Sequence, residues 1–252
     1  MPFLERDGVR IFYEAAGEGP PVLLSHGYSA TSRMWRGQVE VLAPRYRIIT
    51  WDMRGHGQSD SPDDPALYSE AATVADMAAI LDALGIDTAV IGGLSLGGYM
   101  SLAFHLAHPG RVRALMLFDT GPGYRNPAGR EAWNRTAEAR AVAFETRGLD
   151  ALGAGAEVRI AQHRSAKGLA LAARGMLAQF DSRVIESLET IRVPTLVLVG
   201  EKDEPFLGAT DYMAAKIPGA QKVVIPGAGH AANIDNPAAF NAAVEAFLAA
   251  LP

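Results

Sequence analysis

The sequence contains no cysteine, and this absence removes several kinds of chemistry at once. Disulfides, thiolate nucleophiles and cysteine-based metal sites are all excluded. The sequence also lacks the run of about 18 apolar residues that a membrane-spanning helix requires. It has no Lys/Arg-rich run that would bind phosphates, and its formal net charge is −5. We therefore expect no binding to nucleic acid or to a membrane.

No secretory signal is visible near the N-terminus. The charged residues Glu5, Arg6 and Asp7 come before an apolar segment of sufficient length can form. We therefore expect a cytoplasmic protein. The 252 residues, of which 49% are hydrophobic, suit one large α/β domain or a core with an insertion.

Short runs rich in Val, Ile and Leu recur along the chain and predict buried strands. They cover residues 3–5, 9–14, 22–24, 46–51, 89–92, 112–118, 193–199 and 222–225. Asp7-Gly8 between the first two runs is a hairpin signal. The later runs show no polar alternation, which is typical of parallel strands covered on both faces.

Helical patterns lie between these runs or after them. They span residues 69–84, where Ser69 is the expected N-cap, 96–108, and 238–251 after Pro237. The alternation of strands and helices predicts an α/β fold, with a mostly parallel eight-stranded sheet flanked by helices.

Residues 121–188 interrupt this alternation of strands and helices, because they contain no strand-like run and are rich in Ala, Arg and Glu. They follow the C-terminal end of a predicted strand, where ligands gather in sheets of this kind. The sequence therefore predicts an α/β core formed by residues 1–120 and 189–252, with a small helical cap at 121–188. A packing elaboration of the core is the alternative.

Gly93-Leu94-Ser95-Leu96-Gly97 fits the pattern G-x-S-x-G between a predicted strand and a predicted helix. A serine on such a sharp turn sits in strained backbone geometry that lifts its hydroxyl above the sheet. The N–H of Leu96 can then point at a developing oxyanion. Ser95 is the candidate nucleophile, and the alternative is a glycine-rich turn with an incidental serine.

A serine hydroxyl needs a base, and the base needs an orienting acid. The histidines are His26, His56, His105, His108, His163 and His230. His230 follows the last predicted strand in a Gly-Ala-Gly-His loop, which makes it the expected base. We expect His105 and His108, in or at the end of the helix after Ser95, to point away or to sit on its surface, and His163 in the cap to face solvent. Asp203 ends the preceding strand-like run and is the expected acid, with Glu201, Glu204 and Asp119 as rivals.

The order Ser95, Asp203, His230 across successive strand ends resembles the α/β-hydrolase family, and the resemblance covers the chain outside the cap. His26-Gly27-Tyr28 is similar to the family's HG-x motif, which implies that the N–H of Tyr28 is a second oxyanion-hole donor. Residues 52–59 resemble the D-x-R-G-x-G-x-S turn of the lidded branch, which that branch uses mainly as structure. Residues 229–237 fit the family's histidine loop.

The resemblance also implies an activity. Serine at position 95 separates the chain from epoxide hydrolases and haloalkane dehalogenases, which carry aspartate there. The layout looks most like small carboxylesterases and enol-lactonases. It implies cleavage of an ester or lactone of a small, partly hydrophobic substrate through an acyl-enzyme, with no metal or organic cofactor. Two alternatives stay open: carbon–carbon bond hydrolysis by the same triad, and a small-molecule receptor with little turnover.

Candidate substrate-binding residues are the large apolar side chains of the cap and of the strand ends. They are Trp133, Met176, Phe180 and Phe206, with Tyr28 and Leu96 as further wall positions. An arginine of the cap could hold a carboxylate, and the candidates are Arg135, Arg140, Arg159 and Arg164. The sequence carries no signal of oligomeric state.

Overall fold

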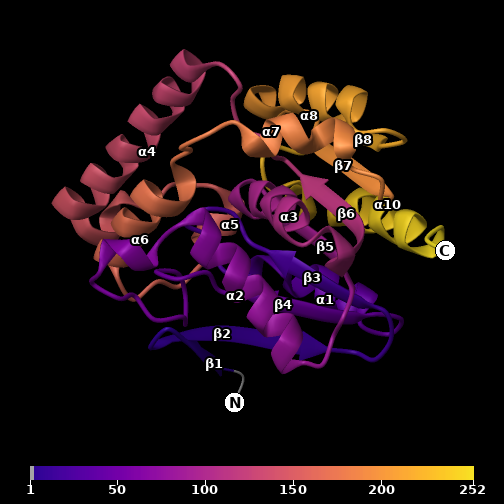
Figure 1. Cartoon of the computed structure of the whole chain (residues 1–252), viewed down its shortest axis with the longest axis horizontal. Helices are drawn as coiled ribbons and strands as arrows, with labels where there is room; N and C mark the ends of the chain where they lie inside the picture. The colour runs from indigo at the N-terminus through magenta and orange to yellow at the C-terminus, as the bar shows by residue number, and fades with distance from the viewer. Residues whose placement is uncertain (1–2) are drawn as a thin grey trace.

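The protein is described by a computed structural model covering residues 3–252, which contains one eight-stranded sheet (Figure 1). The strands are β1 (Phe3–Arg6), β2 (Val9–Ala16), β3 (Pro21–Ser25), β4 (Arg47–Trp51), β5 (Ala89–Leu94), β6 (Val112–Phe118), β7 (Thr195–Gly200) and β8 (Gln221–Ile225). Their order is β1-β2-β4-β3-β5-β6-β7-β8. The pairs β1–β2 and β2–β4 are antiparallel and every other pair is parallel, which confirms the predicted fold class.

The central strands are apolar throughout because both of their faces are covered. In β3, Leu23 packs in one hydrophobic cluster, whereas Val22 and Leu24 pack in the other. Successive side chains of a strand point to opposite faces, so a strand between two layers of helices needs apolar residues at every position.

Helices cover both faces of the sheet (Figure 1). Outside residues 121–188 they are α1 (Arg36–Leu42), α2 (Glu70–Ala83), α3 (Leu96–Ala107), α8 (Glu204–Lys216), α9 (Ala232–Asp235) and α10 (Pro237–Ala249), with short 3₁₀ turns η1 (Ser32–Trp35), η2 (Pro65–Leu67) and η3 (Pro109–Arg111). Helices α2, α3 and α8 share one cluster, and α1 and α10 share the other. The side chain of Ser69 caps α2 by accepting from the amide of Ala72 at 3.0 Å.

Between β6 and β7, the described chain is helical without any strand. This segment holds α4 (Pro127–Arg147), η4 (Gly148–Ala151), α5 (Ala156–Arg159), α6 (Ala166–Ala172), the π-helical turn η5 (Ala173–Leu177), α7 (Arg183–Ser187) and η6 (Leu188–Thr190). Figure 1 shows α4 and α6 gathered at one end of the molecule. The segment contacts the core through Tyr28, whose hydroxyl donates to the carbonyl oxygen of Leu169 at 2.8 Å.

Among the helices of residues 3–252, none combines the length and the apolar character needed to cross a membrane.

Candidate active site

Ser95 occupies the turn between β5 and α3, with φ 54° and ψ −116°. A residue other than glycine adopts this region only when its surroundings fix it. Here the Ser95 amide donates to the carbonyl oxygen of Phe118 at 2.9 Å, and the Ser95 carbonyl accepts from the hydroxyl of Thr120 at 2.6 Å. The end of β6 therefore holds the strained turn from both sides.

Close packing of α3 against the end of β3 explains why residue 97, two positions after Ser95, is glycine. A Cβ atom at Gly97 would lie 2.2 Å from the carbonyl oxygen of Ser25. Only glycine permits this approach, which brings the start of α3 against the segment that follows β3. The same packing places Gly27 beside Ser95, since a Cβ on Gly27 would lie 3.4 Å from the Ser95 Cβ.

His230 and Asp203 lie on the loops that follow β8 and β7. The imidazole Nδ1 is 2.8 Å from the carboxylate Oδ2 of Asp203, which is 4% exposed. A carboxylate acceptor fixes hydrogen on Nδ1 and leaves Nε2 free to accept a proton. Burial lowers the pKa of His230, but the hydrogen bond and the charge of Asp203 outweigh it, so the pKa lies above its ordinary value.

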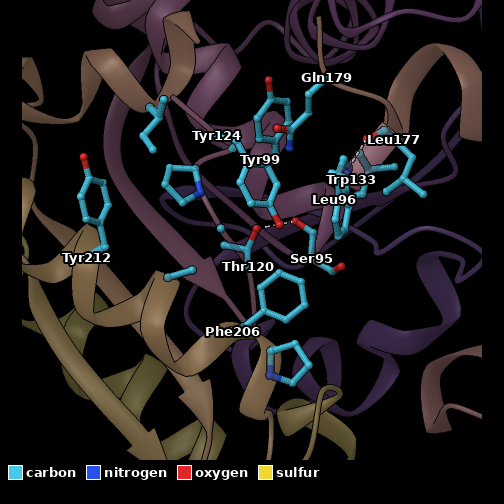
Figure 2. A pocket seen from close by; sticks show the side chains of 16 residues that line it. Ser95, Leu96, Tyr99, Thr120, Tyr124, Trp133, Leu177, Gln179, Phe206 and Tyr212 are labelled. Carbon is cyan, nitrogen blue, oxygen red and sulfur yellow. Dashed lines mark hydrogen bonds between the residues drawn. The ribbon is translucent and has the colours of Figure 1, made fainter. Parts of the chain in front are cut away.

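The ring of Phe206 connects this pair to the cavity next to Ser95. Phe206 stacks on the His230 imidazole, with ring centroids 5.0 Å apart and planes 27° apart. Phe206 and Ser95 both line one pocket of about 330 Å³ (Figure 2). His230 and Asp203 are thus hydrogen-bonded to each other, and Phe206 is the residue that contacts His230 and lines the same pocket as Ser95.

Asp119, the rival acid, has a different environment. It follows β6 with a positive φ of 46° and is fully buried. Its Oδ1 accepts from the amide of Gly200 at 2.7 Å, and its Oδ2 has no hydrogen-bond partner among residues 3–252. Burial raises the pKa of Asp119 to about 8. Of the two carboxyl groups, only that of Asp203 is hydrogen-bonded to His230.

The amides of Tyr28 and Leu96 lie on the two segments that flank Ser95. Leu96 is the first residue of α3, and first-turn amides have no partner within their own helix. For the Tyr28 amide, no backbone oxygen among residues 3–252 is an acceptor. An oxyanion hole needs such amides, with no partner of their own, on the segments next to the nucleophile.

The pocket is mainly aromatic and aliphatic. It is lined by Ser95, Leu96, Tyr99, Thr120, Gly121, Pro122, Gly123, Tyr124, Trp133, Leu177, Gln179, Ile185, Pro205, Phe206, Ala209 and Tyr212. Within residues 3–252 the lining therefore contains no Lys, Arg, His, Asp or Glu. None of the four arginines of residues 121–188 that were expected as carboxylate ligands takes part in it.

Three of the expected wall residues, Leu96, Trp133 and Phe206, belong to this lining, but the other three do not. Met176 is 1% exposed and packs in the hydrophobic core, whereas Phe180 is 72% exposed to solvent. The Tyr28 hydroxyl instead donates to Leu169 of the helical segment.

Gln179 is a lining residue that the sequence analysis missed. Its backbone is held by the side chain of Asn134 through two hydrogen bonds of 2.7 and 2.8 Å. Its side-chain Oε1 is buried without a partner among the described residues. No periodicity or motif distinguishes this glutamine from the others in the chain.

The histidines other than His230 have structural surroundings. His163 does not face solvent as expected: it lies between the amide of Gly57 (3.2 Å) and the carbonyl oxygen of Ser29 (2.9 Å). His26 and His56 are fully buried, and each imidazole bonds its own turn through one nitrogen and the other turn through the second. His105 is buried in α3.

The turn at residues 52–59 was expected to be bonded internally, but its polar side chains also bond to segments outside it. Asp52 accepts from the amides of Ser32 and Gln58, and Arg54 is paired with Asp76. Across residues 3–252, no group of three His, Asp or Glu side chains is arranged to hold a metal ion.

A mostly parallel eight-stranded sheet, with a serine on a strained turn after its fifth strand, defines the α/β-hydrolase class of folds. The family profile described as alpha/beta hydrolase fold matches residues 20–167. The chain belongs to this family.

Individual relatives align along nearly the whole chain. The putative 2-succinyl-6-hydroxy-2,4-cyclohexadiene-1-carboxylate synthase of Bacillus subtilis (strain 168) is 32% identical, over 97% of both chains. The crystal structure of the enol-lactonase from Burkholderia xenovorans LB400 superposes with a TM-score of 0.85 and 27% identity, over 98% of this chain and 100% of that one. A thermophilic esterase from Thermogutta terrifontis, solved with malate bound, gives a TM-score of 0.82 and 31% identity, over 99% and 97%.

Proposed function

We propose that the protein is a serine hydrolase that cleaves a carboxylic ester or lactone of a small, partly hydrophobic substrate. The observation that carries the proposal is the hydrogen bond from His230 to the buried Asp203. The His230 ring also stacks on Phe206, which lines the same pocket as Ser95. The similarity to an enol-lactonase and to an esterase supports acyl transfer as the reaction.

In the proposed reaction His230 takes the hydroxyl proton of Ser95 as the oxygen attacks the acyl carbonyl. Asp203 orients the imidazole and stabilises its charged form. The amides of Tyr28 and Leu96 bind the oxyanion, and a donor of this kind is worth on the order of 3–4 kcal/mol of barrier. His230 then protonates the leaving alcohol, and water activated by the same imidazole cleaves the acyl-enzyme.

We further propose that residues 121–188 act as a cap over this site. The proposal is supported by the pocket wall, which combines core residues such as Ser95 and Phe206 with Tyr124, Trp133 and Gln179 from the helical segment. A cap of this kind sets substrate specificity and excludes water from the reacting groups.

The test is hydrolysis of a short p-nitrophenyl ester by Ser95→Ala and Asp203→Asn. We expect Ser95→Ala to lose at least about a thousandfold in kcat, because the nucleophile is gone, and Asp203→Asn to lose most turnover, because the imidazole tautomer is no longer fixed. Ser182→Ala, which removes an exposed hydroxyl of the helical segment, is the control and should keep full activity.

Full activity in Ser95→Ala would reject the nucleophile assignment. Absence of turnover on any ester or lactone by the unaltered protein would instead favour a receptor, and turnover restricted to a vinylogous diketone would favour carbon–carbon cleavage.

A further inference from the structure

Three histidines hold the turn that carries the Tyr28 amide. His26 donates from Nδ1 to the carbonyl oxygen of Gly27 at 2.7 Å, and its Nε2 accepts from the amide of Met53 at 3.0 Å. His56 accepts at Nε2 from the amide of Ser29 at 3.2 Å. His163 donates from Nε2 to the carbonyl oxygen of Ser29 at 2.9 Å. His26 and His56 belong to the core, whereas His163 belongs to the helical segment 121–188.

The geometry of the peptide group links these bonds to the proposed oxyanion hole. The carbonyl of Gly27 and the N–H of Tyr28 share one trans peptide plane and point in opposite directions. The Gly27 carbonyl is fixed by His26 and by the amide of Ala30 at 3.1 Å. The Ala30 amide shares its own trans peptide plane with the Ser29 carbonyl, so the direction of the Tyr28 N–H depends on how that second plane is held.

The next residue in the turn, Ser29, has an unfavourable backbone conformation. Ser29 has φ 57°, in the left-handed region that costs a residue with a Cβ atom free energy. Such a conformation persists only where neighbours determine it, and here both polar backbone groups of Ser29 are bound by imidazoles, its N–H by His56 and its carbonyl by His163. Without the bond from His163, the buried carbonyl of Ser29 would lose the partner that balances the strain.

The protonation state of His163 suits this task. Burial lowers the pKa of His163, and the groups facing it are the rings of His56, at 5.7 Å, and His26, the carboxylate of Asp52 and the neighbouring guanidinium of Arg164. The ring is therefore neutral near neutral pH. Because its Nδ1 accepts from the Gly57 amide, its one hydrogen is on Nε2, where Ser29 needs it.

We propose that His163 is a positioning residue for oxyanion stabilisation: from the helical segment, it fixes the Ser29 carbonyl and thereby the direction of the Tyr28 amide. The inference depends on the proposed hydrolase function. It means that catalysis is complete only when this segment is docked against the core, so that the cap contributes to the transition state as well as to the pocket wall.

Two substitutions separate the two hydrogen bonds of His163. In His163→Gln the amide nitrogen can take the place of Nε2 and keep the bond to Ser29, while the bond from Gly57 is lost. In His163→Asn the shorter side chain can accept from Gly57 but cannot reach Ser29. Both are compared with His108→Asn, a substitution at the far end of α3, outside both turns.

The measurements are kcat and KM for a p-nitrophenyl ester, the inhibition constant of a trifluoromethyl ketone with the same acyl chain, and the thermal midpoint of each variant. We expect His163→Asn to lower kcat about tenfold or more at unchanged KM. The inhibition constant of the ketone should rise by the same factor, because the ketone adduct, unlike the bound substrate, carries an oxyanion. His163→Gln should stay within about threefold of the unaltered protein, like His108→Asn.

Equal losses in the Gln and Asn variants, or a loss confined to KM, would overturn the inference, because they would mean that His163 only attaches the helical segment. A drop in kcat that leaves ketone binding unchanged would overturn it as well. Failure of the proposed function has a different signature: either the unaltered protein shows no turnover of any ester or lactone, or Ser95→Ala retains the turnover of the unaltered protein.

Discussion

At the scale of single residues, two carboxyl groups near His230, those of Asp203 and Asp119, have different surroundings. Asp203 is hydrogen-bonded to the imidazole. Asp119 is fully buried, has one oxygen without a partner among the described residues, and has a pKa raised to about 8. Near neutral pH we therefore infer that Asp119 retains its proton, and only Asp203 is placed to orient the imidazole.

The raised pKa of Asp119 makes a prediction about stability. In the unfolded chain this carboxyl ionises near its ordinary pKa of about 4, whereas in the folded protein it ionises near 8. Between these values the folded state binds more protons, so this group lowers the free energy of unfolding as the pH rises. Asp119→Asn removes the effect and retains an acceptor for the Gly200 amide.

Urea unfolding at several pH values measures this effect. The free energy of unfolding of Asp119→Asn, relative to the unaltered protein, should increase from pH 4 to pH 8 and level off above it. Its ester hydrolysis at pH 7 should stay within about tenfold, because the residue is already neutral there. A stability difference that is constant over this pH range would contradict the assignment.

At the scale of elements, the sheet could be predicted almost completely from the sequence. The run at 112–118 matches β6 residue for residue, and the run at 22–24 lies inside β3. The signal is strong because buried parallel strands need apolar residues on both faces. The N-cap residue of α2 could also be predicted, because the Ser69 side chain bonds an amide only three residues ahead in the sequence.

The helical segment could be predicted only as helical. Phe180 and Trp133 look alike in the sequence, yet one is exposed and the other lines the pocket. The difference follows from how α4, α6 and the π-helical turn pack, which depends on contacts distant in the chain. His163 was predicted to face solvent for the same reason: its partners are backbone groups of Gly57 and Ser29, which have no sequence signature.

The ionic cluster of Asp76, Arg6 and Arg54 joins three elements, and a prediction about stability follows from it. Asp76 on α2 is fully buried and accepts from Arg6 of β1 at 2.6 Å and from the buried Arg54, which follows β4, at 2.7 and 2.8 Å. Removing one partner of a buried ion pair leaves an uncompensated charge and costs about 3–5 kcal/mol.

We therefore expect Asp76→Ala to lower the free energy of unfolding by about that amount in urea titrations. Asp82→Ala on the same helix is the matched control, because the Asp82 side chain is 64% exposed where it pairs with Arg111, and pairs open to solvent contribute about 1 kcal/mol or less. Similar effects of the two substitutions would mean that burial does not decide the strength of these pairs.

At the scale of the whole molecule, the charge distribution restricts the substrates that the proposed site can accept. The net charge of −5 repels anions at long range. The pocket wall, within the described residues, offers no cationic side chain to a carboxylate that has entered. Transfer of an unpaired carboxylate from water into an apolar cavity is strongly unfavourable. Both effects favour an uncharged acyl group.

A matched pair of substrates tests this selectivity. One is p-nitrophenyl hexanoate, and the other is the mono-p-nitrophenyl ester of adipic acid, whose six-carbon acyl chain ends in a carboxylate. We expect kcat/KM to be at least about tenfold higher for the uncharged ester. Raising the salt concentration should narrow the gap only in part, because salt screens long-range repulsion but not the loss of hydration inside the pocket. Equal or better turnover of the carboxylate ester would contradict the prediction and would mean that a cation from outside the described lining, such as one of the cap arginines, reaches the substrate.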